Sequence, residues 1–471
     1  MKLTFFGGIR EIGGNKILLS DEDTRIFLDF GMSFGERGKY FEEFLTPRTA
    51  AGIKDFLVMG LIPDIKGIYR EDLLEHMGRE AEEPEVDGVV LSHAHADHVN
   101  YVSFLHKDIP IYCGETCKRI IDAVDEQSQR TIENEVLNFK KRPIFNSDRR
   151  NPPIERTFST FVTGDKFKIG SIEIEPIHVD HSVPGAYGFI IWTSSGPVIY
   201  TGDLRMHGLR SEMTSDFIER ARDVKPIAMI TEGTRIGTKR TGESENKVYL
   251  ESKEEIGKCK GLSIVDFNFK DVDRFRTFYR IAKETGRKLV ISFKHCCFLE
   301  KYNEDKKLGV PSSTDENILI LKPKRKTGTY CDAEDYVDRY IKCRLDYPNI
   351  ITAEEIARRP SNYIVVLNFW YFNTLIDLNP VGAQYIHSLS EPFNEEMEIS
   401  SDRMMNWLGH FKMNHVQSHC SGHINGEDIK ELIETINPGV LFPVHTEHPG
   451  MFRDLNMKTR LIRYGKDYEI P

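Results

Sequence analysis

Residues 91–100, LSHAHADHVN, place three histidines and an aspartate within six positions, directly after an apolar run. A packed core would exclude such a group, because burying an unpaired polar side chain costs about 2–7 kcal/mol. Alternate side chains at the end of a strand point the same way, so His93, His95 and Asp97 can converge while His98 turns to a neighbouring position. These are zinc-ligand types, and four of them are too many for one catalytic ion. The stretch therefore predicts one wall of a site for two metal ions.

Several later segments also read as strands that end in metal-ligand residue types. They are IEIEPIHVDHSVPG (172–185), PVIYTGDLRMHG (197–208), IAMITEGTR (227–235) and GVLFPVHTEH (439–448). Their polar side chains are His178, Asp180, His181, Asp203, Glu232 and His445. One sheet edge could collect them into a single site, although spacing alone does not choose between His178 and His181.

The composition sets limits on the class of protein. A chain of 471 residues predicts at least two domains. The net charge of −10 argues against a generally basic surface for nucleic acid, but a local basic groove remains compatible with it. No apolar run approaches the roughly 18 residues of a membrane span, and the N-terminus lacks the apolar region of a signal peptide. We therefore expect a cytoplasmic protein without a membrane partner.

The character of the sequence changes after Arg235. Residues 263–269 and 287–293 read as strands, and 271–286 between them read as an amphipathic helix. Such a unit is typical of a parallel α/β layer. We therefore predict a domain at 236–386, inserted into a domain formed by 1–235 and 387–471.

The segment HAHADH resembles the HxHxDH motif of the metallo-β-lactamase fold. Asp29 in FLDFG resembles the first motif of that fold, and HSVPG resembles the third, which selects His181 over His178. TGD resembles the fourth, which gives Asp203 as a bridging carboxylate. The resemblance implies an α/β fold, the αββα sandwich of the metallo-β-lactamases.

The rest of the chain resembles the β-CASP branch of this superfamily. SGH at 421–423 and PVHTE at 443–447 match its later histidine motifs, and Glu232 matches its acidic one. The insertion at 236–386 occupies the place of the β-CASP α/β domain, and GGIREIGGNK is similar to the start of ribonuclease J. The resemblance implies a short form of ribonuclease J without its C-terminal domain. The chain departs from the family at Val99-Asn100, at Phe269-Lys270 and in HSLSEP at 387–392.

The resemblance also implies roles for individual residues. One metal ion would be held by His93, His95 and His181, and the other by Asp97, His98 and His445, with Asp203 between them. Two Zn²⁺ ions are expected, with Mn²⁺ as the alternative. Asp97, Asp203, His423 and Glu232 would be catalytic, with Glu232 holding His423 in its protonated form. Ser388, Ser421, Gly422 and His423 would contact the substrate, although a plain turn explains the first three about as well.

The function implied is a metal-dependent ribonuclease that hydrolyses phosphodiester bonds of single-stranded RNA, as a 5′→3′ exonuclease, an endonuclease or both. One alternative is a hydrolase of the same fold that acts on DNA or on a small phosphoester, and another is a non-catalytic RNA-binding subunit. The presence of His445 and of every expected ligand disfavours both. A homodimer or association with RNA-processing machinery would fit. Basic clusters that could line an RNA path are Lys140, Lys141, Arg142, Arg149, Arg150, Arg156, Lys322, Lys324, Arg325 and Lys326.

Overall fold

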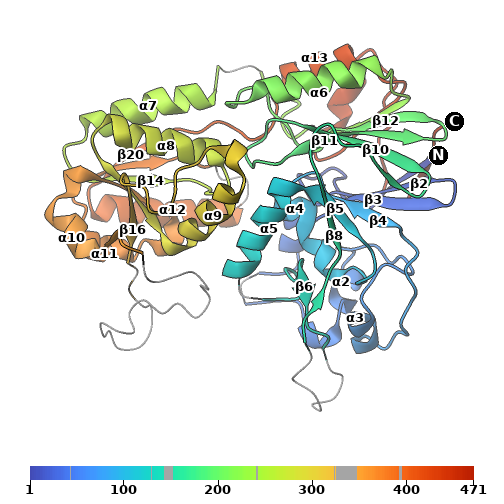
Figure 1. Cartoon of the computed structure of the whole chain (residues 1–471), viewed down its shortest axis with the longest axis horizontal. Coiled ribbons are helices and arrows are strands. Elements are labelled where there is room, and N and C mark those ends of the chain that lie inside the picture. Colours follow the sequence, from blue (N-terminus) through green and yellow to red (C-terminus); the bar gives the residue numbers. More distant parts are fainter. Residues whose placement is uncertain are drawn as a thin grey trace.

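The computed structural model describes the whole chain except residues 43, 129, 143–151, 240–241, 323, 325–346 and 392–394 (Figure 1). In this described part, three large β-sheets carry helices on their faces. Four members of the predicted basic clusters lie outside the described residues: Arg149, Arg150, Arg325 and Lys326.

Two of the sheets form a sandwich. In spatial order, the first consists of β22 (Asp467–Glu469), β1 (Lys2–Phe5), β2 (Lys16–Asp21), β3 (Thr24–Phe30), β4 (Gly88–Val90), β5 (Ile111–Gly114) and β8 (Phe158–Phe161). The second consists of β21 (Leu441–Pro443), β13 (Ala228–Thr231), β12 (Gly196–Tyr200), β11 (Tyr187–Thr193), β10 (Ile172–His178) and β9 (Phe167–Ile169). Residues from both ends of the chain complete the sandwich, because β22 pairs with β1 and β21 pairs with β13.

An apolar core lies between these two sheets and includes Phe5, Leu28, Ile174, Phe189 and Phe442. Helices cover the outer faces, as the αββα architecture requires. They are α1 (Phe34–Gly38), α2 (Lys54–Val58), α3 (Glu71–His76), α4 (Ala96–Val99), α5 (Glu115–Gln127), α6 (Ser211–Asp223) and α13 (Gly426–Ile436).

The third sheet is entirely parallel and belongs to the insertion. Its strands, in spatial order, are β17 (Ile350–Ile351), β16 (Ile318–Leu321), β15 (Lys288–Ser292), β18 (Tyr363–Val366), β14 (Ser263–Asp266), β19 (Gln384–His387) and β20 (Asn414–Gln417). Its helices are α7 (Glu245–Lys258), α8 (Val272–Glu284), α9 (Phe293–Glu304), α10 (Ala353–Arg358), α11 (Thr374–Leu378) and α12 (Glu395–His410). A parallel sheet buried on both faces accounts for its nearly continuous apolar strands.

The predicted strand–helix–strand unit is present as β14, α8 and β15. Helix α8 buries Val272, Phe275, Phe278 and Ile281, the apolar positions that the helical spacing indicates. Strand β20 belongs to the third sheet although it lies beyond residue 386. The domain boundaries themselves stay predictions.

The two halves of the molecule meet at helices α5 and α9 (Figure 1). Thr116 of α5 donates a hydrogen bond of 2.6 Å to Asp305, which follows α9, and Lys301 of α9 lies 3.5 Å from Glu126 of α5. The sandwich and the insertion therefore share a packed interface.

Strands β10, β12, β13 and β21 run in the same direction, so their carboxyl ends meet at one edge of the second sheet. The residues that follow these strands include His181, Asp203, Glu232 and His445. The facing edge of the first sheet supplies residues 91–98 after β4. The shared strand direction thus brings together side chains that lie up to several hundred residues apart.

Candidate metal centre

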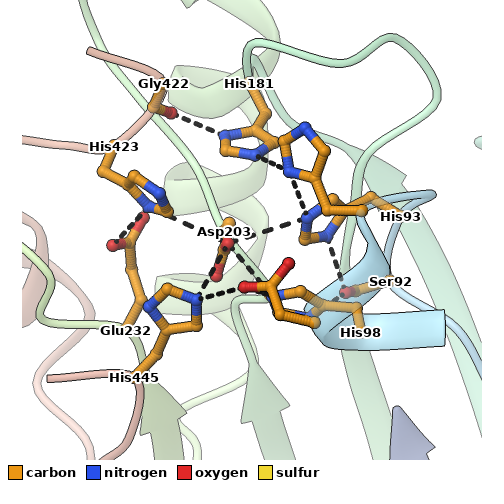
Figure 2. Close-up of polar contacts among 12 residues, drawn as sticks. Ser92, His93, His98, His181, Asp203, Glu232, Gly422, His423 and His445 are labelled. Atoms are coloured by element: carbon orange, nitrogen blue, oxygen red, sulfur yellow. Dashed lines mark hydrogen bonds and ion pairs between the residues drawn. The ribbon is translucent and has the colours of Figure 1, made fainter. Parts of the chain in front are cut away.

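Seven side chains converge at this edge of the sandwich in two overlapping groups (Figure 2). The first group is His93, His95, His181 and Asp203, and the second is Asp97, His98, His445 and Asp203. Within each group, one potential ligand atom per residue lies within 4.8 Å of the others. Asp203 belongs to both groups and lies between them in Figure 2.

The local geometry of residues 91–100 differs from the alternation that we predicted. Strand β4 ends at Val90, and Asp97 and His98 lie in the short helix α4. A helical turn therefore directs Asp97 and His98 to the second group, while His93 and His95 in the preceding loop face the first.

The nitrogen atoms of the first group are spaced as ligands of one cation would be. His95 Nδ1 lies 3.1 Å from His93 Nε2 and 3.1 Å from His181 Nε2. A tetrahedral zinc with Zn–N bonds of about 2.0–2.1 Å would place its ligand atoms about 3.3 Å apart. A positive ion bound by all three imidazole nitrogens explains this spacing better than hydrogen bonds between the rings do.

Partners outside the cluster fix the rings of the histidines. His98 Nδ1 donates to Asp29 at 2.7 Å, and His181 Nδ1 donates to the Gly422 carbonyl at 2.6 Å. His445 Nδ1 lies 2.8 Å from the hydroxyl of Thr234. In each ring the other nitrogen, Nε2, is left for the cluster, which is the usual arrangement of metal-binding histidines.

The cluster also contains buried polar atoms that form no hydrogen bond with any described residue. These atoms are both carboxylate oxygens of Asp203 and His98 Nε2, although Asp203 Oδ2 lies 3.1 Å from His98 Nε2. Asp203 is 1% exposed and His98 is fully buried. Buried polar atoms normally have partners, and leaving one without costs about 1–3 kcal/mol. Divalent ions would satisfy these atoms, so the residues present fit the metals that the resemblance implies.

His423 and Glu232 lie beside the cluster as a hydrogen-bonded pair (Figure 2). His423 Nδ1 donates to Glu232 Oε2 at 3.0 Å, and Asp203 Oδ2 lies 3.8 Å away. Burial disfavours the charged imidazole, but the carboxylates of Glu232 and Asp203 outweigh it and raise the pKa of His423 to about 9. The arrangement provides a protonated imidazole whose Nε2 is free of the Glu232 bond.

The four predicted substrate contacts are not all brought to the site. Gly422 lies against it, because a Cβ there would be 2.5 Å from Ser182 Oγ and 3.2 Å from His181 Cε1. Ser421 lies next to it, and its carbonyl accepts from His207 Nε2 at 2.8 Å. Ser388 is 1% exposed and hydrogen-bonded to Arg274 and to the Ser418 carbonyl. Ser388 therefore stabilises the interior of the insertion, and the structure gives no support to a substrate contact there.

Three residues near the site were not singled out from the sequence. Thr234 Oγ1 contacts both His445 and His423, and the Tyr200 hydroxyl donates to Asp29 at 2.5 Å. Lys270 Nζ donates to the carbonyl of Ala94, between two of the histidines, at 3.4 Å. Thr234 could have been found from its position two residues after Glu232 at a strand end. Tyr200 reads as an ordinary core residue, and the sequence marked Lys270 only as a departure from the family pattern, with no role assigned.

Most described members of the predicted basic clusters form ion pairs or hydrogen bonds with other groups of the protein. Lys141 pairs with Glu71 at 3.1 Å and Arg142 with Glu135 at 2.9 Å. Arg156 is 6% exposed and donates to the carbonyls of Ser103 and Leu105. Lys324 pairs with Glu354 and Asp377. These side chains stabilise the fold locally, and the structure does not support them as an RNA path.

No helix in the described part of the chain is both long and apolar enough to cross a membrane.

Two family models match the chain. Residues 63–229 match a model described as a Beta-lactamase superfamily domain, and residues 410–458 match one described as a Zn-dependent metallo-hydrolase RNA specificity domain. The first range contains the HAHADH segment, His181 and Asp203, and the second contains His423 and His445. With the ligand groups described above, these matches support the use of a divalent metal.

The chain is similar along almost all of its length to proteins named ribonuclease J. It is 22% identical to that of Helicobacter pylori strain J99 over 96% of this chain, and it spans 57% of that relative. It is 22% identical to Ribonuclease J 2 of Streptococcus pyogenes serotype M3 over 98% of this chain and 72% of the relative. The same identity and 98% coverage hold for Ribonuclease J of Mycobacterium tuberculosis strain H37Rv, of which 71% is covered.

A solved structure confirms the fold. A protein of unknown function from Enterococcus faecalis V583 aligns over 99% of both chains with a TM-score of 0.74 and 23% sequence identity. This similarity shows the fold alone, and the chemistry has to be inferred from the residues of the site.

Proposed function

Because the chain has the metallo-β-lactamase fold and resembles ribonuclease J over 96% of its length, we propose that it is a metal-dependent ribonuclease. Its substrate would be single-stranded RNA, and its reaction the hydrolysis of phosphodiester bonds. The observation that carries the proposal is the pair of ligand groups that share Asp203 and lie beside the His423–Glu232 pair. Two adjacent cation sites and a proton donor are the parts that phosphodiester hydrolysis requires.

We assign one Zn²⁺ ion to His93, His95 and His181, and a second to Asp97, His98 and His445, with Asp203 between them. When bound, two divalent ions neutralise charge on the phosphoryl oxygens and make water nucleophilic at neutral pH. Asp29 contributes by holding His98 in one tautomer, and Thr234 contributes by holding His445. The chain thereby orients both groups before a substrate arrives.

His423 supplies the proton in this proposal. Its Nδ1 is bound to Glu232, so the proton on Nε2 can pass to the oxygen that leaves the phosphorus. Glu232 is itself fixed, because its Oε1 accepts from the Leu204 amide at 2.9 Å. General-acid assistance of this kind is typically worth about 10²–10⁴-fold in rate. Asp97, Asp203, His423 and Glu232 are thus the proposed catalytic residues.

Removal of nucleotides in the 5′→3′ direction is the proposed mode, with internal cleavage as the second mode that the resemblance implies. A cytoplasmic location and a homodimer, or association with RNA-processing machinery, belong to the same proposal. The descriptions of the matched domain and of the relatives support an RNA substrate.

The test uses purified protein, Zn²⁺ or Mn²⁺, and 5′-labelled single-stranded RNA that ends in monophosphate, triphosphate or hydroxyl. We expect labelled mononucleotide from the monophosphate RNA, and loss of this product by at least about 10²-fold in Asp97→Ala. Asp21→Asn is a matched control, because Asp21 is a buried carboxylate that binds Ser194 away from the cluster.

Internal fragments that do not depend on the 5′ end would indicate an endonuclease instead. Absence of RNA cleavage with metal bound would contradict the proposal and favour DNA or a small phosphoester as substrate. RNA binding without cleavage of any of these substrates would favour a non-catalytic subunit.

A further inference from the structure

Five exposed basic side chains line two adjoining grooves beside the metal centre. Arg10, Arg453, Arg460, Arg463 and Lys466 line a groove of about 380 Å³. Arg10, Arg453 and Leu461 also line the neighbouring groove of about 480 Å³, together with residues 447–451. We call these five residues the basic groove.

The charges of the basic groove are not neutralised within the described part of the chain. None of the five forms an ion pair there, in contrast to Lys141, Arg142 and Lys324 of the predicted clusters. Glu447 is the one carboxylate among the described residues that line the two grooves. On a protein with a net charge of −10, unpaired positive charge gathered in this way creates a local field that attracts anions.

The segments that form the groove contact two of the proposed metal ligands. The Gly8 carbonyl accepts from the His445 amide at 2.8 Å, and Ile9 and Thr446 form a parallel bridge. A Cβ on Gly13 would lie 2.4 Å from Asp97 Oδ2. The loop that presents Arg10 therefore lies against two proposed ligands, and the chain after His445 forms the groove wall.

We propose that the basic groove binds the phosphates of the RNA strand beyond the bond that is cleaved, an inference that rests on the proposed ribonuclease function. The partner is a single-stranded polyanion bound through its backbone, because arginine recognises phosphate with several donors. Tyr468 is the one aromatic ring among the described residues that line the first groove, and Lys466 Nζ lies 5.5 Å from its centroid. Binding is therefore expected to be insensitive to base sequence.

The direct test measures binding of single-stranded RNA by fluorescence anisotropy at several salt concentrations, with every protein in the Asp97→Ala background. The variant is Arg453→Gln/Arg460→Gln/Arg463→Gln. Each phosphate contact on single-stranded nucleic acid contributes about 0.7 to the slope of log K against log salt. Loss of three contacts should lower the slope by about 2 and the affinity by roughly 100-fold at 0.1 M salt.

Lys253→Gln/Lys258→Gln/Arg280→Gln is the matched control, because it removes the same charge from α7 and α8 on the insertion (Figure 1). These three side chains already pair with Glu284, Glu254 or Glu255. The control should bind RNA within about twofold of the parent. Equal weakening of both triple variants, or an unchanged slope in the groove variant, would overturn the proposal.

Cleavage assays, in which every protein keeps Asp97, separate this proposal from the proposed function. The groove variant should lose kcat/KM on a long RNA and keep parental activity on a dinucleotide, because the one phosphodiester of a dinucleotide is the bond that is cleaved. Equal activity of variant and parent on both substrates would overturn the groove while leaving the ribonuclease intact. Failure of the parent to cleave either substrate would refute the ribonuclease, and the binding assay would still decide whether the groove holds RNA.

Discussion

Asp29 accepts four hydrogen bonds beside the proposed metal centre. Its carboxylate accepts from the Ser92 amide and hydroxyl, from His98 Nδ1 and from the Tyr200 hydroxyl. It is fully buried and adopts a positive φ of 56°, a conformation that non-glycine residues rarely use. The hydrogen bonds of its carboxylate offset the strain at this residue and fix the loop that carries His93 and His95 and the helix that carries His98.

At this residue we predict that Asp29→Asn weakens metal binding about 10–100-fold, as loss of partners behind metal ligands typically does. An amide cannot accept from all four donors, so His98 would lose its fixed tautomer. Titration with Zn²⁺ in the presence of a chelator measures the change. Asp21→Asn loses a comparable buried acceptor far from the cluster, so equal loss of metal affinity in the two variants would contradict the prediction.

Helix α13 shows how an element positions the loop that carries His423. Asn425 caps it, accepting from the amides of Glu427 and Asp428 at 3.1 and 2.9 Å. Its buried face consists of Ile429, Leu432, Ile433 and Ile436, which pack on the second sheet. The start of the helix at Gly426, three residues after His423, is therefore fixed by both capping and packing.

For this element we predict that Asn425→Ala lowers the free energy of unfolding by about 1 kcal/mol, because two amides at the helix start lose their acceptor. Thermal or urea denaturation of the apo protein measures it. Asn425→Ser keeps an uncharged acceptor oxygen for these amides and should retain most of the stability. An alanine variant as stable as the parent would show that packing alone fixes the start of α13.

The stability of the whole molecule should depend on pH through Asp266 at the end of β14. Burial raises the pKa of Asp266 to about 7, and the Tyr385 hydroxyl donates to its Oδ2 at 3.0 Å. Between pH 4 and 7 the folded state therefore keeps a proton that the unfolded state has released. Stability contributed by this group falls as pH rises across that window, by up to about 1.4 kcal/mol per pH unit.

Asp266→Asn removes this titration, so the variant should gain stability relative to the parent as pH rises from 4 to 7. Urea denaturation at several pH values measures the difference in unfolding free energy. A difference that stays constant with pH would show that Asp266 has an ordinary pKa in the folded protein.

Much of the fold could be predicted because its patterns are local. Helix α8 carries its apolar residues at helical spacing, and the strands after residue 262 are short apolar runs. The sequence pattern alone therefore predicts both kinds of element. The short helix α4 could not be predicted, since the strand pattern before it gives no sign that β4 ends at Val90. The tertiary contacts of residues 91–100 decide their conformation.

The sequence by itself determined the architecture and the residue types of the metal centre, because ligand residues directly follow strands whose shared direction brings their ends together. Only the tertiary structure decided how those residues are used. It buries Ser388 beside Arg274 and pairs Lys141 and Arg142 with carboxylates. It also places Arg10 and Arg453 in one groove, where neither forms an ion pair with a described residue. The physical reason is that the effect of a charge or hydroxyl depends on the groups that face it, and those groups come from distant parts of the chain.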